Sequence, residues 1–303
     1  MIKATTLVDE WFRLQVESGR RTWLLLEGAA KNDCLQDIFS LEQNPQYAFL
    51  FASNPSLGAL LSLSPMLVSV TAQSPLVEWF LTEDRCSCLG VFLSGPGDLE
   101  TTAATLTQAI FPSREAGGHT LCRWQDPQVL CDCMQVPAVF PLVVRGLFSI
   151  LLRADIAESI GAWVHCEIPE DRKQVREALR IPLSFLDDVH ELRETRLLDR
   201  HIATLKGDLT ERKKTFSRRF HDCDVRILSS LSHGPVNEAE REAVRDDCRE
   251  LQKKYDITEF SQLLDIRTLL HGNPESTGDF DAHLSDATLP THKRIALCRK
   301  HVR

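Results

Sequence analysis

Residues 43–77 read QNPQYAFLFASNPSLGALLSLSPMLVSVTAQSPLV, a stretch of 35 residues without one charged side chain. A transmembrane helix needs only about 20 consecutive apolar residues, so the length alone permits one. Prolines 45, 55, 65 and 75 exclude it, because each Xaa-Pro pair disfavours helix at the residue before the proline. The stretch therefore predicts several short elements, and we interpret the ten-residue proline spacing as turn spacing rather than as a structural repeat.

The segments around this stretch alternate between helical and strand-like patterns. Leu7, Trp11 and Leu14 are spaced as on one face of a helix that ends at Gly19. Such alternation indicates a mixed α/β layer. The other elements that we expect are strands at Thr22–Leu26, Tyr47–Phe51, Met66–Thr71 and Cys88–Leu93, and helices at Leu76–Leu81 and after Asp98.

Charge density changes near Val136-Pro137. Residues 1–135 hold 8 basic and 15 acidic side chains, whereas residues 136–303 hold 27 and 28. A charge-poor half is typical of a buried sheet, and a charge-rich half of amphipathic helices. We therefore predict an α+β protein, with an N-terminal mixed α/β lobe over 1–135 and an all-helical C-terminal lobe over 136–303. Expected helices there are Ser184–Lys206, Asn237–Tyr255, Phe140–Leu152, Asp171–Leu179, Val225–Leu231, Glu259–Leu270 and Pro290–Lys300.

The composition narrows the class of protein. At 303 residues, with 43% hydrophobic and 26% charged residues, the chain is long enough for two cores and is typical of globular proteins. A net charge of −8 repels nucleic-acid phosphates and anionic lipids, so we expect neither nucleic acid nor membrane as a partner. Ten cysteines are too few for a disulfide scaffold, and the first ten residues contain no apolar signal core. We expect reduced thiols and a cytoplasmic protein.

The motifs of common enzymes are missing from the sequence. Ser94-Gly-Pro-Gly-Asp98 lies between a strand and a helix, but Asp98 and Glu100 would place negative charge where a phosphate should bind. No Gly-x-Ser-x-Gly elbow is present. His119, Cys122, Cys131 and Cys133 have an irregular spacing for zinc, and we interpret the cysteines as buried apolar residues. We predict no catalytic, cofactor or metal site.

One cluster of basic residues remains, formed by Arg212, Lys213, Lys214, Arg218 and Arg219. The region from 205 to 226 carries seven basic and four acidic residues. A solvated helix face is one interpretation, and a protein-binding patch that steers an acidic partner is another. DNA binding is a third, although residues 136–303 as a whole are not basic.

Five short sequence motifs occur in order in the first 135 residues. They are Trp23-Leu-Leu-Leu-Glu27-Gly28-Ala29, Ser64-Pro65-Met-Leu-Val68, Trp79, Gly90-Val-Phe-Leu-Ser94 and Leu121-Cys-Arg123-Trp124-Gln-Asp126-Pro127-Gln-Val-Leu130. In this order they resemble the bacterial type VI secretion effector chaperone (adaptor) family, domain of unknown function 4123. Gln125 and Gln128 stand where that family often has tyrosine and arginine. The resemblance covers about residues 8–135.

The resemblance implies a non-enzymatic chaperone of the bacterial cytoplasm. Members of this family bind a cognate toxic effector and help to load it onto the VgrG spike, often with a PAAR tip. The alternatives that the sequence leaves open are a hydrolase with an unrecognised site and a DNA-binding regulator that uses the helical lobe.

We interpret the signature residues as structural rather than reactive: Trp23, Glu27, Gly28, Pro65, Arg123, Asp126 and Pro127. Glu27 and Arg123 are expected to pair and to close the edge of the sheet. Asp126-Pro127 fits a turn or the first residues of a helix. As contacts for the effector we propose Trp79, Trp124 and Trp163, with the basic cluster as a polar rim.

Overall fold

The computed structural model describes residues 4–28, 34–82, 90–156, 159–169, 180–182, 184–210, 214–220, 223–229, 231–273 and 277–301. It divides into two compact units. The first unit consists of residues 1–190 and 211–232, and the second of residues 191–210 and 233–303. The chain therefore crosses between the units three times.

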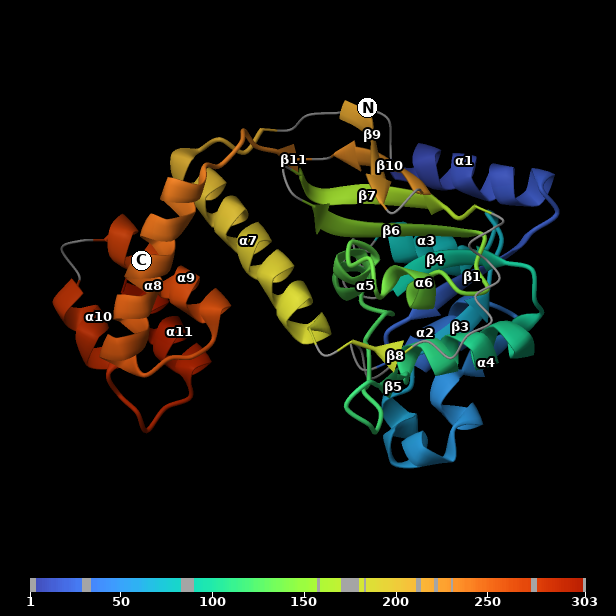
Figure 1. Ribbon diagram of the computed structural model, residues 1–303, viewed down its shortest axis with the longest axis horizontal. Helices are drawn as coiled ribbons and strands as arrows, with labels where there is room; N and C mark the ends of the chain where they lie inside the picture. The colour runs from blue at the N-terminus through green and yellow to red at the C-terminus, as the bar shows by residue number, and fades with distance from the viewer. Residues whose placement is uncertain are drawn as a thin grey trace. The chain divides into compact units, whose positions relative to one another are not determined.

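The first unit is built on one large sheet in which every pairing is antiparallel (Figure 1). Its strands follow the order β2-β3-β1-β4-β6-β7-β10-β9, and β11 also pairs with β7. A separate parallel pair is formed by β5 (Ser113–Arg114) and β8 (Arg180–Ile181). The strands of the large sheet are β1 (Arg21–Leu26), β2 (Tyr47–Phe49), β3 (Met66–Ser69), β4 (Gly90–Gly95), β6 (Ser149–Ile156), β7 (Ser159–Glu167), β9 (Lys214–Phe220), β10 (Cys223–Ser229) and β11 (Leu231–Ser232).

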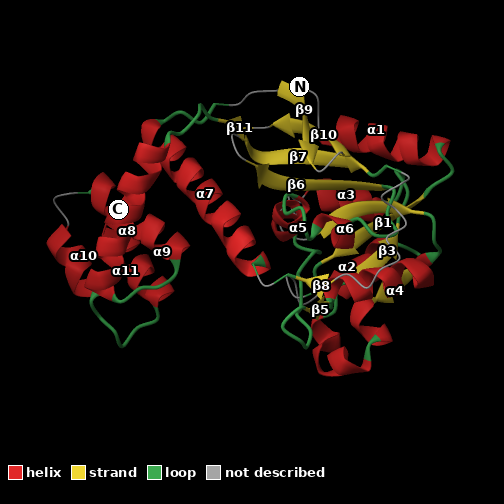
Figure 2. Cartoon of the chain, in the orientation of Figure 1, coloured by secondary structure: helices red, strands yellow, loops and turns green. Residues whose placement is uncertain are grey.

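Helices cover both faces of this sheet (Figure 2). One face packs against α1 (Ala4–Glu17), α2 (Cys34–Leu41) and α3 (Pro75–Thr82), whose apolar residues form one core with Leu24 and Leu26 of β1. The opposite face meets α4 (Leu99–Ile110), α5 (Pro127–Met134) and α6 (Phe140–Val143). Burial on both faces explains why β1 reads as the unbroken apolar run Trp23–Leu26 rather than as an alternating pattern.

The second unit is helical. It contains the part of α7 (Phe185–Lys206) from Glu191 onward, together with α8 (Glu238–Tyr255), α9 (Phe260–Gly272), α10 (Thr277–Leu284) and α11 (Thr291–His301). Asn237 begins α8 with a capping box, in which its side chain accepts from the Glu240 amide and Glu240 accepts from the Asn237 amide. Leu198 and Ile202 of α7 pack with the apolar residues of the other four helices.

The α+β class is confirmed, but two helices predicted beyond residue 136 are wrong in part or in whole. The predicted helix Phe140–Leu152 is helical only over Phe140–Val143, because Ser149–Ile156 is strand β6, and Val225–Leu231 falls mainly in strand β10. These segments are short apolar runs that helix and strand patterns share, and they become strands because β4, β7 and β9 offer them hydrogen-bonding partners. The predicted helix Asp171–Leu179 lies outside the described residues.

The seam at Val136 also does not coincide with the division into units. The sheet begun by β1–β4 continues through β6, β7, β10 and β9, so the first unit extends far beyond residue 135. Only α7 from Glu191 and α8–α11 are separate from it. After Val136, helices α7 and α8 carry more charged side chains than all the strands, and these helices begin only at Phe185 and Glu238, so the rise in charge density does not mark the boundary of the helical unit.

Candidate partner-binding site

The signature residues meet around the carboxylate of Glu27, directly after β1. Glu27 is only 2% exposed. Its Oε2 accepts hydrogen bonds from Arg123 Nη2 at 2.9 Å, from Arg123 Nε at 3.3 Å and from Gln125 Nε2 at 3.0 Å. The hydrogen bond to Glu27 raises the pKa of the Arg123 guanidinium. Three donors on one carboxylate oxygen compensate for the cost of burying its charge.

The predicted Glu27–Arg123 pair is confirmed, but its predicted place at the sheet edge is wrong. β1 lies between β3 and β4 inside the sheet, and Arg123 lies in the loop before α5. The pair therefore ties this loop to the end of an interior strand. The Arg123 side chain remains 57% exposed, so one side of the pair faces solvent.

Asp126 and Pro127 begin α5 as predicted. The Asp126 carboxylate accepts from the amides of Gln128 and Val129, and Pro127 occupies the first turn. Gln128 stands where the family that this sequence resembles often has arginine. Its Nε2 donates to the Asp155 carbonyl at 3.0 Å, and its Oε1 accepts from the Asp155 amide at 2.8 Å. The two glutamines that depart from the family pattern therefore both hold the fold together.

Gly28 and the Ser64-Pro65 motif are in contact at the same end of the sheet as Glu27. A Cβ atom on Gly28 would lie 2.1 Å from the carbonyl oxygen of Ser64, which is closer than real Cβ atoms approach. The buried Ser64 hydroxyl accepts from the Phe51 amide at 3.0 Å and donates to the Pro65 carbonyl at 3.0 Å. These contacts fix both ends of the segment between residues 51 and 64.

That segment carries a cluster of exposed leucines. It forms two turns of 3₁₀ helix, η1 (Leu50–Ser53) and η2 (Pro55–Leu63), and the Asn54 side chain caps η2 by accepting from the Ser56 amide at 3.0 Å. Leu57 is buried and anchors the segment. We name its exposed side the leucine face, which comprises Leu60 (36% exposed), Leu61 (43%) and Leu63 (49%).

The charge-free stretch from Gln43 to Val77 was the signal in the sequence for this face. We predicted strands at both ends of the stretch but no element over residues 54–63. Apolar residues are usually expected in a core, and only the three-dimensional structure shows that these three leucines lie outside the core. Adjacent exposed apolar side chains are typical of a surface that another molecule covers.

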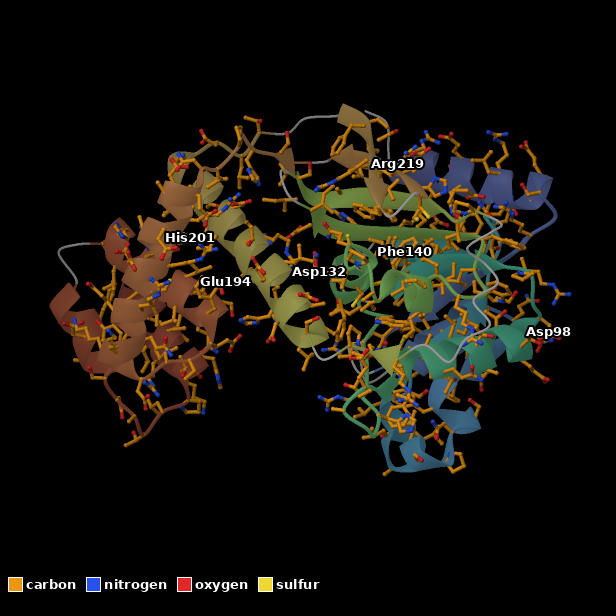
Figure 3. The ribbon with its side chains drawn as sticks, viewed as in Figure 1. Asp98, Asp132, Phe140, Glu194, His201 and Arg219 are labelled. Atoms are coloured by element: carbon orange, nitrogen blue, oxygen red, sulfur yellow. The ribbon has the colours of Figure 1, made fainter. Side chains whose placement is uncertain are left out.

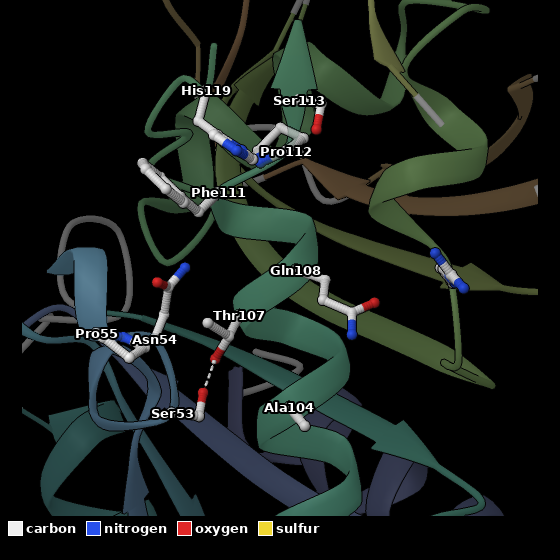
Figure 4. A pocket seen from close by; sticks show the side chains of 11 residues that line it. Ser53, Asn54, Pro55, Ala104, Thr107, Gln108, Phe111, Pro112, Ser113 and His119 are labelled. Carbon is white, nitrogen blue, oxygen red and sulfur yellow. Dashed lines mark hydrogen bonds between the residues drawn. The ribbon is translucent and has the colours of Figure 1, made fainter. Parts of the chain in front are cut away.

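A hollow of about 420 Å³ adjoins the start of η2 (Figure 4). It lies between Asn54 and Pro55 and the end of α4, where Thr107 binds both the Leu50 carbonyl at 2.7 Å and the Ser53 hydroxyl at 3.2 Å. His119 stacks on Phe111 at its far wall, with ring centroids 4.9 Å apart. The hollow is open and partly polar, so it suits a side chain of a protein partner better than an enclosed small molecule.

The tryptophans predicted as contacts are mostly inside the fold. Trp124 and Trp163 are 2% and 5% exposed and offer a partner almost no area. Trp79 is partly buried and packs against the core formed by α1–α3. The leucine face is therefore a better candidate than these tryptophans for an apolar contact surface.

The basic cluster lies on a strand and not on a helix. Arg218 and Arg219 are exposed residues of β9, and Figure 3 shows Arg219 on that strand. Lys214 begins β9, whereas Arg212 and Lys213 lie outside the described residues. The interpretation as a solvated helix face is therefore wrong for the described part of the cluster.

The cysteines behave as buried apolar groups. Cys122, Cys131 and Cys133 are buried, whereas His119 is exposed and stacked on Phe111. Burial raises the pKa of Cys122 to about 12, so its thiol stays protonated at neutral pH. Among the described residues, no three or more His, Cys, Asp and Glu side chains gather as a metal site. Nor does any described helix combine the length and apolarity that crossing a bilayer requires.

Comparison with known proteins gives one match. Residues 22–138, from β1 to just before α6, match the family model of the domain of unknown function DUF4123. No curated protein and no solved structure matches the chain significantly. The matched range contains the signature residues around the Glu27–Arg123 pair and the Gly28–Ser64 contact, which are Glu27, Gly28, Pro65, Arg123 and Asp126. Residues 22–138 are therefore similar to the DUF4123 family, which is known as a family of type VI secretion effector chaperones and adaptors.

Proposed function

We propose that this protein is a non-enzymatic chaperone of the bacterial cytoplasm that binds a cognate type VI secretion effector and promotes its loading onto the VgrG spike or a PAAR tip. The match of residues 22–138 to DUF4123 is the observation that carries the proposal. The leucine face supports it, because a chaperone needs an apolar surface that its client covers.

The effector contacts, in this proposal, the leucine face and the adjoining hollow beside Asn54. Neither surface carries an acidic side chain, and the hollow contributes Arg145 and the exposed His119 at its margin. Burial of exposed apolar area gives affinity, while the polar hollow can orient the bound segment.

The hydrolase alternative has a candidate array in Ser149, His165 and Glu167, which the geometry disfavours. Ser149 is fully buried and accepts a hydrogen bond from Trp11 Nε1 at 2.8 Å. His165 Nε2 lies 3.0 Å from the Ser149 hydroxyl and 3.5 Å from Glu167, so one ring nitrogen faces both groups. A catalytic triad instead places nucleophile and carboxylate on opposite nitrogens and leaves the nucleophile accessible.

The regulator alternative predicts salt-sensitive binding to random duplex DNA. Arg218 and Arg219 lie on a strand, and the chain carries a net charge of −8, so the electrostatic footprint of a DNA-binding domain is missing. We expect no such binding in a gel-shift experiment at low salt.

The test is co-expression with the cognate effector. The wild-type protein should retain the effector through affinity purification, and the triple variant Leu60→Ser, Leu61→Ser, Leu63→Ser should lose about 1 kcal/mol or more of binding free energy for each leucine that the effector buries.

A matched control replaces Leu186 and Leu205 of α7 with serine, since these leucines are 61% and 45% exposed but lie outside the leucine face. This control should bind normally. The proposal fails if the effector stays soluble and is exported normally from a strain that lacks this gene.

A further inference from the structure

The large sheet ends in strand β9, whose outer edge is unpaired among the described residues. All seven residues from Lys214 to Phe220 pair with β10 in one continuous register, without a bulge. The strand order ends at β9, so no described strand lies on its other side. In an antiparallel ladder the backbone N–H and C=O groups of alternate residues point to opposite sides. The outer groups of β9 therefore form a regular row of donors and acceptors.

The opposite edge of the same sheet is different. β2 has only three residues, Tyr47–Phe49, and the chain turns directly into η1. Short edge strands, bulges, prolines and charged side chains are the usual means by which proteins block unwanted strand pairing. Of these features β9 has only the charged side chains: it is long, regular and free of proline and glycine.

The two faces of β9 present different side chains along this edge. Phe216, Arg218 and Phe220 share the face of their partners Ile227, Val225 and Cys223, which are fully buried. The Arg218 guanidinium lies 6.0 Å from the centre of the Phe220 ring. Thr215, Ser217 and Arg219 lie on the other face. A strand added beside β9 would thus meet one arginine on each face.

The charge of β9 determines which strand fits. Its sequence KTFSRRF has three basic residues and no acidic one. Among the described residues, no carboxylate pairs with Arg218. Arg219 Nε pairs with Asp224 Oδ1 at 3.4 Å, but the Asp224 side chain is 78% exposed. A second copy of β9 would bring like charges together, which destabilises pairing. An acidic strand instead gains opposite charges on both faces.

We propose that the outer edge of β9 binds an extended acidic segment of a partner protein as an added β-strand. Main-chain hydrogen bonds supply affinity, and carboxylates beside Arg218 and Arg219 supply selectivity. The proposal rests on the proposed function only in taking the secretion effector as the protein that carries this segment; the binding property belongs to the edge itself.

The first test uses a peptide and is independent of the effector. A heptapeptide of valine and threonine with two adjacent glutamates at its centre, one for each face of the strand, is titrated into the full chain while backbone amide NMR signals are followed. Signals of β9 should shift, and binding should weaken with salt. The variant Arg218→Glu, Arg219→Glu should weaken binding about tenfold, which corresponds to about 1.4 kcal/mol.

The charge-matched control is Arg13→Glu, Arg114→Glu, which changes two exposed arginines of the same unit outside β9. This control should bind the peptide as the wild type does. Equal binding by the β9 variant and the wild type, or a peptide that shifts no β9 signal, would overturn the proposal. A dimer in sedimentation that disappears in the β9 variant would overturn it too, because the edge would then bind a second copy.

The second test uses the complex with the effector. Hydrogen–deuterium exchange should slow at β9 when the effector is bound. A stable complex in which β9 exchanges as in the free protein overturns the acidic-strand proposal and leaves the chaperone function standing. If no complex forms, the chaperone function fails and the peptide titration alone decides the property of the edge. Random duplex DNA that competes for the β9 signals would assign the edge to nucleic acid and overturn the proposal.

Discussion

Glu27 is a buried charged residue, and its hydrogen bonds from Arg123 and Gln125 help to determine what a substitution costs. Glu27→Gln removes the charge but keeps one oxygen that can accept from Arg123 and Gln125. We expect a loss of about 1–3 kcal/mol of unfolding free energy, because charge-assisted hydrogen bonds become neutral ones while Arg123 remains partly solvated. Urea denaturation followed by circular dichroism measures the loss.

The control for this substitution is Glu17→Gln. Glu17 also pairs with an arginine, Arg13, but both side chains are more than half exposed. Exposed pairs contribute at most about 1 kcal/mol, so this variant should remain within about 0.5 kcal/mol of the wild type. An unchanged melting midpoint for Glu27→Gln would refute the structural role of the signature pair.

His201 makes the stability of the second unit depend on pH. The side chain is buried, and burial followed by the charge of Arg267 lowers its pKa to about 4. Arg267 Nη1 donates to His201 Nε2 at 2.8 Å, so the native imidazole is neutral at that nitrogen. The unfolded state binds a proton near pH 6.5 and the folded state only near pH 4, so stability falls as the pH drops between these values.

The measurement is the unfolding free energy from pH 7 to pH 4.5 for the wild type and for His201→Gln. The wild type should lose on the order of 2–3 kcal/mol more over this range than the variant, because only the wild type carries this imidazole. Parallel pH profiles for the two proteins would contradict the assignment. His190→Gln, which changes an exposed histidine of the same helix, serves as the control.

At the scale of elements, the leucine segment depends on the close contact between Gly28 and Ser64. Gly28→Ala should destabilise the protein by about 1–3 kcal/mol, since a Cβ atom would lie 2.1 Å from a backbone oxygen that cannot move without shifting η2. Gly58→Ala lies in η2 itself with nothing within 4 Å and should be nearly neutral. Thermal melting of both variants makes the comparison, and equal midpoints would show that the contact is unimportant.

Elements with complete local signals could be predicted from the sequence. The capping box at Asn237 and the positive φ of Gly19 and Gly207 mark the ends of α8, α1 and α7 close to the predicted residues. Such signals lie within a few residues of the backbone groups that they satisfy, so no tertiary information is required.

Elements whose partners come from elsewhere in the chain were mispredicted. β6 and β10 are strands because they complete ladders with β4, β7 and β9, and their own residues favour neither period decisively. The candidate site shows the same limit of local patterns. The Glu27–Arg123 pair was predicted from the sequence motifs of the family, whereas the exposure of Leu61 and the burial of Trp124 depend on packing that no local pattern encodes.

At the scale of the whole molecule, the continuous sheet predicts how fragments behave. A fragment of residues 1–135 loses β6, β7, β9 and β10 and exposes the side of β4 that pairs with β6. We expect it to aggregate or remain unfolded. Residues 1–232 keep every described strand and should give a folded sheet by circular dichroism and two-dimensional NMR. A well-dispersed spectrum from 1–135 would restore the boundary predicted from charge density.

The path of the chain between the units also constrains its biosynthesis. β7 ends at Glu167, but its neighbour β10 begins only at Cys223, after the helix α7 has been made. At roughly 5–20 residues per second, the ribosome takes several seconds to cover this interval. Throughout that time the nascent sheet exposes the β7 side of an incomplete ladder, so the growing polypeptide is open to misassociation until β10 has been made.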